Sequence, residues 1–271
     1  RFPYFLGKLH RKRGAFSEAR QSMQRAIERD ETLLEAYGIL AQLSWRLDKD
    51  TEKGEGYVQH IARHSQAIDA DVSNEVAKYY RMIGEKKLAE QWYQSALQHN
   101  PNSRTARLDL AMLYLDTQKT EKALDILEQA REDGVQDVRL SAHLADAYRQ
   151  AEKYDKALEE INKVLETNPE SSEYIFIRGR IHFDRGNYQT ARRDFNKAYE
   201  FDPRFHKAYF YVGRTAFKQG DYKNALKIFR HVLDYQPNKG EFHYWMGRTF
   251  EALGQRKKAL SEYQETTKVD D

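Results

Sequence analysis

The side chains best suited to chemistry are arginines that recur beside aromatic residues toward the C-terminal end of the chain. Arg180, Arg214 and Arg248 follow one another at intervals of 34 residues. A guanidinium presents a planar fork of N–H donors that matches a carboxylate, and aromatic rings supply apolar contact. This combination favours binding of a carboxylate-bearing or extended peptide. The alternative is local structure, because arginine also stacks on neighbouring aromatic rings within a fold.

The sequence lacks the short motifs of common catalytic and cofactor sites. It contains no GxxxxGK phosphate loop and no GxSxG elbow, and the GxG at Gly54 has no third glycine. His60 and His64 have the i, i+4 spacing of zinc ligands, but no third ligand accompanies them. The absence of cysteine excludes disulfides and thiol chemistry. We therefore expect a protein that is not an enzyme, with no catalytic residue, no metal and no cofactor.

A repeat of 34 residues must position the arginines. In residues 206–239, apolar residues recur at helical spacing in two halves that are separated by a turn signal at Gly220. Gly213 and Ala225 are small enough to let two helices approach, and Phe229 fills the space beyond their contact. Equivalent residues occur 34 positions earlier and later along the chain. Such a period predicts a stacked array of helical hairpins.

The repeat unit resembles that of the tetratricopeptide repeat (TPR) family. In the repeat that starts at Ala70, seven of eight family positions fit. Those positions read Ser73, Val76, Ala77, Tyr80, Ala89, Tyr93, Ala96 and Pro101. The resemblance covers the whole chain and implies an all-α fold, a right-handed superhelical α-solenoid of about eight helical hairpins. We expect a single array over residues 1–271, with repeats starting near residues 1, 34, 70, 104, 138, 172, 206 and 240 and an insertion near residues 48–56.

The resemblance also implies a binding site, because TPR proteins hold ligands in a concave groove lined by the first helix of each repeat. The predicted ligand-binding groove consists of Phe176, Arg180, Phe183, Phe210, Tyr211, Arg214, Phe217, Tyr244, Trp245 and Arg248. A secondary groove is predicted from Lys8, Arg11, Asn74, Lys78, Arg81, Asp109 and Asp146. The best-known TPR site, a clamp for two carboxylates, uses lysine and asparagine in the order opposite to that of Asn74 and Lys78. We therefore do not carry that function over.

Composition narrows the choice of partner and leaves the compartment open. The chain has 45 Lys and Arg against 42 Asp and Glu, interspersed as on solvated helix faces, which argues against nucleic acid. No apolar run is long enough to span a membrane, and no targeting signal is present in the sequence. Because the chain starts with arginine and not methionine, we expect it to be part of a longer protein. Both the cytoplasm and the bacterial envelope remain possible locations.

The leading functional hypothesis is a non-catalytic protein–protein interaction scaffold whose groove binds a protein or peptide segment, acidic with an apolar anchor. One alternative is a TPR scaffold of a bacterial envelope assembly, as in polysaccharide export or pilus assembly, which a signal peptide upstream of Arg1 would indicate. A second is an RNA-binding array in which arginine and aromatic side chains stack on bases. A steep dependence of RNA binding on salt would indicate that alternative.

Overall fold

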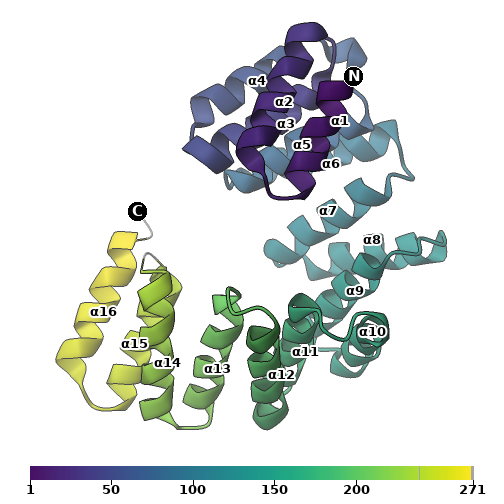
Figure 1. Cartoon of the computed structure of the whole chain (residues 1–271). Helices are drawn as coiled ribbons and strands as arrows, with labels where there is room; N and C mark the ends of the chain where they lie inside the picture. Colours follow the sequence, from purple (N-terminus) through teal and green to yellow (C-terminus); the bar gives the residue numbers. More distant parts are fainter. Residues whose placement is uncertain (238, 270–271) are drawn as a thin grey trace. The chain divides into compact units, whose positions relative to one another are not determined.

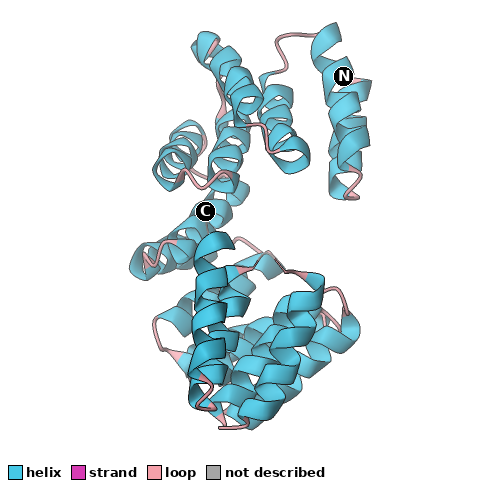
Figure 2. Ribbon diagram, turned by 90° about the vertical axis from the view of Figure 1, so that its left-hand side faces the viewer, coloured by secondary structure: helices cyan, strands magenta, loops and turns pink. Residues whose placement is uncertain are grey.

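Helices make up the regular structure of this chain. The structure, a computed structural model, describes residues 1–237 and 239–269. Every regular element within these residues is a helix, with sixteen α-helices and one short 3-10 helix (Figure 2). The predicted all-α fold of about eight helical hairpins is confirmed. None of the described helices combines the length and the apolar composition that a membrane crossing requires.

The helices form two compact units, Arg1–Gln136 and Asp137–Asp271, each with four hairpins (Figure 1). The first unit contains α1 (Phe2–Lys12), α2 (Phe16–Arg29), α3 (Leu34–Asp48), α4 (Thr51–Arg63), η1 (Ser65–Ala67), α5 (Ala70–Met82), α6 (Lys86–His99), α7 (Arg104–Asp116) and α8 (Thr120–Glu132). The second unit contains α9 (Val138–Gln150), α10 (Tyr154–Thr167), α11 (Ser172–Asp184), α12 (Tyr188–Phe201), α13 (His206–Lys218), α14 (Tyr222–Tyr235), α15 (Gly240–Ala252) and α16 (Arg256–Val269). Seven of the eight expected repeat starts are the first residue of an odd-numbered helix.

Close packing within a hairpin depends on a small residue that faces a large one. Gly213 on α13 lies so near α14 that a Cβ atom added to it would be 2.6 Å from the Phe229 ring. Gly179 on α11 meets the Phe195 ring in the same way, at 2.7 Å. Ala225 and Phe229 are completely buried. The small and aromatic positions of the repeat therefore form the contact between the two helices of a hairpin, as the spacing predicted.

A residue in the left-handed conformation closes the turn within each hairpin. The eight residues are Gly14, Lys49, Gly84, Gln118, Glu152, Gly186, Gly220 and Gly254, with φ between 57° and 88°. Glycine adopts this conformation freely, whereas the side chains of Lys49, Gln118 and Glu152 disfavour it. The left-handed residue lets the second helix begin within a few residues of the end of the first.

The second repeat is longer than the others, and the structure divides its extra length between α3, which has 15 residues where α5 has 13, and the connection from α4 to α5. The insertion was expected near residues 48–56. In the structure, α3 continues to Asp48 and α4 begins at Thr51, so most of that segment is helical. The Asp50 side chain caps α4 by accepting a hydrogen bond from the Lys53 backbone N–H at 2.8 Å. The longer connection is residues 64–69, between α4 and α5, and it includes η1.

The prediction of an insertion at residues 48–56 rested on the interpretation of Gly54 as a loop residue. Gly54 was taken as a loop residue because it stands with Gly56 among charged residues. In the structure Gly54 is buried within α4, where an added Cβ atom would be 2.5 Å from the Tyr79 hydroxyl oxygen. The glycine thus permits close approach of α4 to α5, which is a packing role that a loop does not have.

We expect trypsin to cut the folded chain first after Arg63. Residues 62–67 are all exposed, and a three-residue 3-10 helix holds the connection with few hydrogen bonds. Mass spectrometry of a brief digest identifies the earliest fragments. First cuts within residues 172–237, where hairpins follow without extra residues, would contradict this expectation.

Candidate functional site

The predicted groove residues come from the first helices of the last three hairpins, α11, α13 and α15. Within each helix, the key positions are separated by steps of four and three residues, so they lie on one face. Helix α11 begins where the Ser171 side chain accepts a hydrogen bond from the Tyr174 backbone N–H at 3.4 Å. Helix α11 contacts α9, and α13 contacts α15, so first helices of successive hairpins lie side by side (Figure 1).

Three of the predicted groove aromatics are buried. Phe210 is 0% exposed, and its ring centroid lies 5.4 Å from that of Phe229 and 4.4 Å from that of Phe242. It therefore belongs to the core between α13, α14 and α15, and its assignment to the groove surface is corrected. Phe176 and Phe183 are nearly as buried. These two rings can support the surface from below but offer little area to a ligand.

The other predicted aromatics keep accessible surface. Tyr244 is 40% exposed, and Tyr211, Phe217 and Trp245 are half-buried. The Phe217 and Trp245 rings meet edge to face at 5.4 Å, and Trp245 meets Tyr244 in the same way at 5.9 Å. The structure thus brings aromatic side chains of α13 and α15 together in one surface.

Arg214 lies among these rings. Its guanidinium carbon is 4.5 Å from the Tyr211 ring centroid, 4.6 Å from that of Trp245 and 5.4 Å from that of Phe183. The nearest ion-pair contact is long, 3.7 Å from Nη1 to the Glu241 carboxylate. Its Nε is buried and has no hydrogen-bond partner within residues 1–237 and 239–269. The rings therefore hold a cation whose hydrogen-bonding capacity is largely unused.

The other two arginines of the row have different surroundings. Arg180 is ion-paired with Asp146 at 3.2 Å, and Asp146 also accepts from Arg149 at 2.7 Å. Burial raises the pKa of Asp146, but the nearby charges of Arg180 and Arg149 lower it by more. The pKa of Asp146 is therefore below its usual value. Arg248 is exposed and donates to the Tyr244 hydroxyl at 3.0 Å. Thus Arg180 is neutralised within the fold, whereas Arg248 remains accessible.

The charged residues of the predicted secondary groove are ion-paired, most of them with residues outside the predicted set. Lys8 binds Glu35 at 2.9 Å, Lys78 binds Glu75 at 3.0 Å and Asp109 at 3.5 Å, Arg81 binds Asp116 at 2.6 Å, and Arg11 binds Glu75 through both of its terminal nitrogens. Asn74 is buried, and its Oδ1 has no hydrogen-bond partner in the described part of the chain. Of this set, the structure joins Arg11, Lys78 and Asp109 in one ionic network through Glu75, while Asp146 lies in the second unit beside Arg180.

Glu75 is the centre of that network, and the sequence reasoning did not select it. It is 5% exposed and accepts hydrogen bonds from Arg11, from Lys78 and from Gln42 Nε2 at 2.8 Å. Burial raises its pKa, but Lys78 and Arg11 outweigh burial and lower the pKa to about 2. A usable signal was present in the sequence, because Gln42 and Glu75 are 33 residues apart and Arg180 and Asp146 are 34 apart. Polar partners at about one repeat length contact each other across adjacent first helices.

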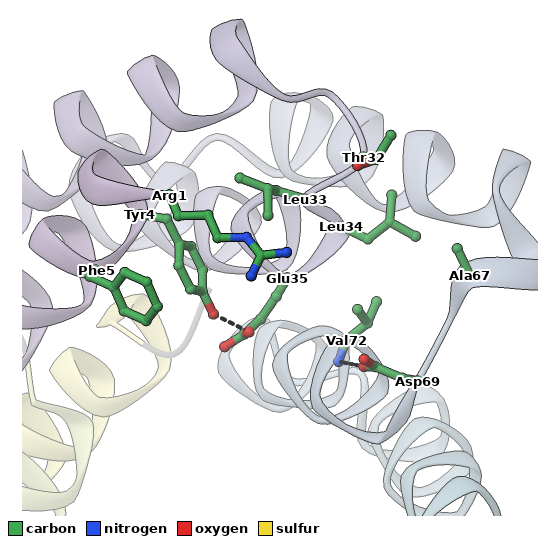
Figure 3. Close-up of a pocket in the computed structure, with 10 residues that line it drawn as sticks. All are labelled: Arg1, Tyr4, Phe5, Thr32, Leu33, Leu34, Glu35, Ala67, Asp69 and Val72. Atoms are coloured by element: carbon green, nitrogen blue, oxygen red, sulfur yellow. Dashed lines mark hydrogen bonds between the residues drawn. The ribbon is translucent and has the colours of Figure 1, made fainter.

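A pocket of about 250 Å³ lies beside α1 in the first unit (Figure 3). Its lining includes Tyr4, Phe5, Leu33 and Glu35. The Tyr4 hydroxyl donates to Glu35, as the dashed line in Figure 3 shows, and burial and this contact raise the pKa of Tyr4. Because Glu35 also accepts from Lys8, its carboxylate is already engaged by two donors and is not poised to hold a ligand.

The two histidines at zinc spacing pack on aromatic neighbours. The His60 ring stacks on Tyr37 with centroids 4.0 Å apart and lies 4.7 Å from the His64 ring. His64 Nδ1 is 3.0 Å from the His60 backbone oxygen. No group of three or more His, Asp or Glu side chains arranged to hold a metal occurs among the residues that the structure describes.

Comparison with protein-family models identifies the repeats. Two tetratricopeptide repeat models match the sequence, one over residues 142–204 and the other over residues 87–142 and 216–271. Together they cover more than half of the chain. The chain belongs to the tetratricopeptide repeat family. Comparison with curated proteins finds no match.

Solved structures share the TPR fold at low sequence identity. A crystal structure of a tetratricopeptide repeat protein from Parabacteroides merdae is 19% identical, with a TM-score of 0.73 over 90% of this chain and 96% of the other. A chain in the crystal structure of the APC/C hetero-tetramer Cut9-Hcn1 is 14% identical, with a TM-score of 0.69. That match covers 94% of this chain and 50% of the other, so this chain spans about half the length of that relative. At these identities the likeness shows the fold alone.

Within this TPR chain, the family matches contain α11 and α15, which carry Arg180 and Arg248. Helix α13, which carries Arg214, begins between the matches over residues 142–204 and 216–271. The TPR pattern concerns packing positions, and Arg214 stands outside those positions. Its role must therefore be argued from its own surroundings.

Proposed function

We propose that the chain is a non-catalytic protein–protein interaction scaffold, and that the surface around Arg214 binds an acidic partner segment through a carboxylate. The observation that carries the proposal is the side chain of Arg214, which is 19% exposed, has its guanidinium among three aromatic rings and is no closer than 3.7 Å to the Glu241 carboxylate. We call the accessible set Tyr211, Arg214, Phe217, Tyr244, Trp245 and Arg248 the aromatic–arginine surface.

The surroundings of Arg214 suit a carboxylate ligand. The neighbouring rings hold the Arg214 side chain in place, so binding a ligand would not require this side chain to become ordered. Glu241, the nearest acidic group, is 3.7 Å away and 52% exposed, and it can turn toward solvent when a ligand carboxylate arrives. A bidentate contact to Arg214 is stronger than the long contact that it would replace, because charge-assisted hydrogen bonds weaken with distance.

The neighbouring rings suit an apolar anchor next to that carboxylate. Tyr244 and Trp245 expose ring surface beside the guanidinium, and Arg248 stands at the edge of the same surface with its charge accessible. Aromatic and arginine side chains are the types that contribute most at interfaces when a partner buries them. Arg180 lacks this property because Asp146 already neutralises it. The carboxylate would therefore be held by Arg214 and Arg248.

Replacing both Arg214 and Arg248 with glutamine is expected to weaken binding by about 2 kcal/mol, roughly thirtyfold. Glutamine keeps part of the aliphatic stem, so the core below should be unchanged. Random peptides displayed on phage are selected on the natural chain, and selected sequences rich in Asp, Glu and aromatic residues are made as peptides for calorimetry.

The control removes the same charge elsewhere, by replacing Lys156 and Lys227, both exposed on second helices, with glutamine. Circular dichroism confirms that each variant is folded. The proposal would be contradicted if basic peptides were selected, or if the two double variants lost affinity equally. Binding of a homopolymeric RNA with a steep salt dependence would instead support the RNA-binding alternative.

A further inference from the structure

A small pocket in the first unit is lined by cationic side chains from three hairpins. It has a volume of about 160 Å³ and lies among α1, α3 and α5. Three of its lining side chains are cationic, Arg11, Arg46 and Lys78, and Phe16 and Met82 contribute apolar wall. No carboxylate lines this pocket among the described residues.

The three cations differ in how far their charge is already compensated. Arg11 and Lys78 both bind Glu75, which lies buried beside them. Arg46 is exposed, and its guanidinium carbon lies 4.3 Å from the Phe16 ring centroid. No ion pair joins Arg46 to a carboxylate anywhere in residues 1–237 and 239–269. The pocket therefore contains one cation that is oriented by a ring and has no acidic partner.

The acidic groups nearby do not cancel the positive charge. Glu75 and Asp109, which is 3.5 Å from Lys78, supply two negative charges against the three positive ones. Glu35 also acts on Arg11, but it is itself paired with Lys8. Although Glu75 is buried, the cations lower its pKa to about 2. The electrostatic potential at the pocket is thus positive enough to hold one carboxylate firmly ionised, and the charge of Arg46 is additional.

From this geometry we propose that the pocket is a subsite for a phosphate group on a phosphorylated serine or threonine of a protein partner. A phosphate dianion has three terminal oxygens and can meet N–H donors from three directions at once, whereas a carboxylate has two oxygens. Arginine and lysine are the usual partners of phosphate. The wall formed by Phe16 and Met82 accommodates the methylene or methyl group that carries the phosphate.

The size of the pocket suits a single phosphate group. Pockets for drug-sized ligands have volumes of roughly 300–1,000 Å³. At about 160 Å³, this pocket is smaller than that range and has room for a single phosphate group and its stem. The subsite belongs to the first unit and shares no residue with the aromatic–arginine surface of the second, so the two proposals can fail separately.

Titration of the isotope-labelled chain with N-acetyl-phosphoserine-amide, followed by amide NMR at constant ionic strength, tests the subsite. We expect saturable shifts for amides of α1, α3 and α5, and an Arg46→Gln variant that binds about tenfold more weakly. Arg46 is exposed, so this variant should remain folded. The matched control is Arg63→Gln, which removes an exposed positive charge from α4 of the same unit and should bind as the natural chain does.

N-acetyl-glutamate-amide, added in a parallel titration, distinguishes phosphate from carboxylate. Binding of the glutamate derivative as tight as that of the phosphoserine derivative would overturn the assignment to phosphate. The proposal also fails if no shifts saturate, or if Arg63→Gln weakens binding as much as Arg46→Gln. The proposal is supported if the phosphoserine derivative binds more tightly than the glutamate derivative and if Arg46→Gln, but not Arg63→Gln, weakens that binding.

Discussion

Replacing Glu75 with glutamine is expected to lower the free energy of unfolding by about 3 kcal/mol. The buried carboxylate of Glu75 accepts hydrogen bonds from Arg11, Lys78 and Gln42. Glutamine has a similar shape but no charge, so it leaves two cations without their shared partner in a site with little water. Urea denaturation of the full chain, followed by circular dichroism, measures the change.

The effect of Glu75 should depend on pH in a defined direction. Its pKa is lowered from 4.5 to about 2 on folding, which corresponds to a stabilisation of about 3 kcal/mol. Because the folded pKa is below the unfolded one, this stabilisation is fully present above about pH 4.5 and is lost as the pH falls through 2. The difference between the natural chain and the glutamine variant should shrink over that range.

A matched control comes from an exposed ion pair in the same unit. Asp48 binds Arg20 at 2.5 Å on the surface, and Asp48→Asn should cost less than about 1 kcal/mol because water screens the pair. Equal losses for Glu75→Gln and Asp48→Asn, or a loss at Glu75 that persists unchanged at pH 2, would show that the network does not stabilise the first unit as described.

Replacing Phe229 with alanine is expected to destabilise the second unit by about 3–5 kcal/mol. The side chain is fully buried, faces Gly213 at the contact of α13 with α14, and packs on the Phe210 ring. Gly213 has no side chain that could move into the cavity, so the lost contacts should not be recovered. Denaturant unfolding of the full chain measures the loss.

Hydrogen exchange then shows where the chain opens. Since each repeat contacts mainly its neighbours, protection should fall in α13, α14 and the adjoining helices and be retained in the first unit. The control is Phe201→Ala, at an exposed position of α12, where we expect a loss below about 1 kcal/mol. Uniform loss of protection across both units would contradict this local model of stability.

The repeat pattern predicted the helices well because every hairpin of the array needs the same small and large residues for its packing. Gly213, Ala225 and Phe229 recur as a set, since each hairpin must solve the same problem of bringing two helices together. The second repeat departs from this rule. Gly54 was read as a loop signal, although the structure uses its missing side chain for close packing against Tyr79.

The binding surfaces were harder to predict, because exposure and pairing depend on neighbours one repeat away. Phe210 and Phe217 are on the same helix, yet Phe210 is buried by α14 and α15, while Phe217 keeps accessible surface. Arg180 and Arg214 occupy equivalent positions, but Arg180 has an aspartate one repeat earlier and Arg214 does not. Sequence position identified the row of arginines, but it did not show that the ion-pair distance is 3.2 Å for Arg180, 3.7 Å for Arg214 and 3.9 Å for Arg248.

The turns described above imply that the hairpins differ in backbone strain along the chain. A residue other than glycine in the left-handed conformation costs about 1 kcal/mol, and Lys49, Gln118 and Glu152 each carry that cost within an earlier hairpin. The last three hairpins close through Gly186, Gly220 and Gly254, which have no such strain. The aromatic–arginine surface is built on these hairpins. The turns beneath this surface therefore do not draw on the stability of the hairpins that carry it.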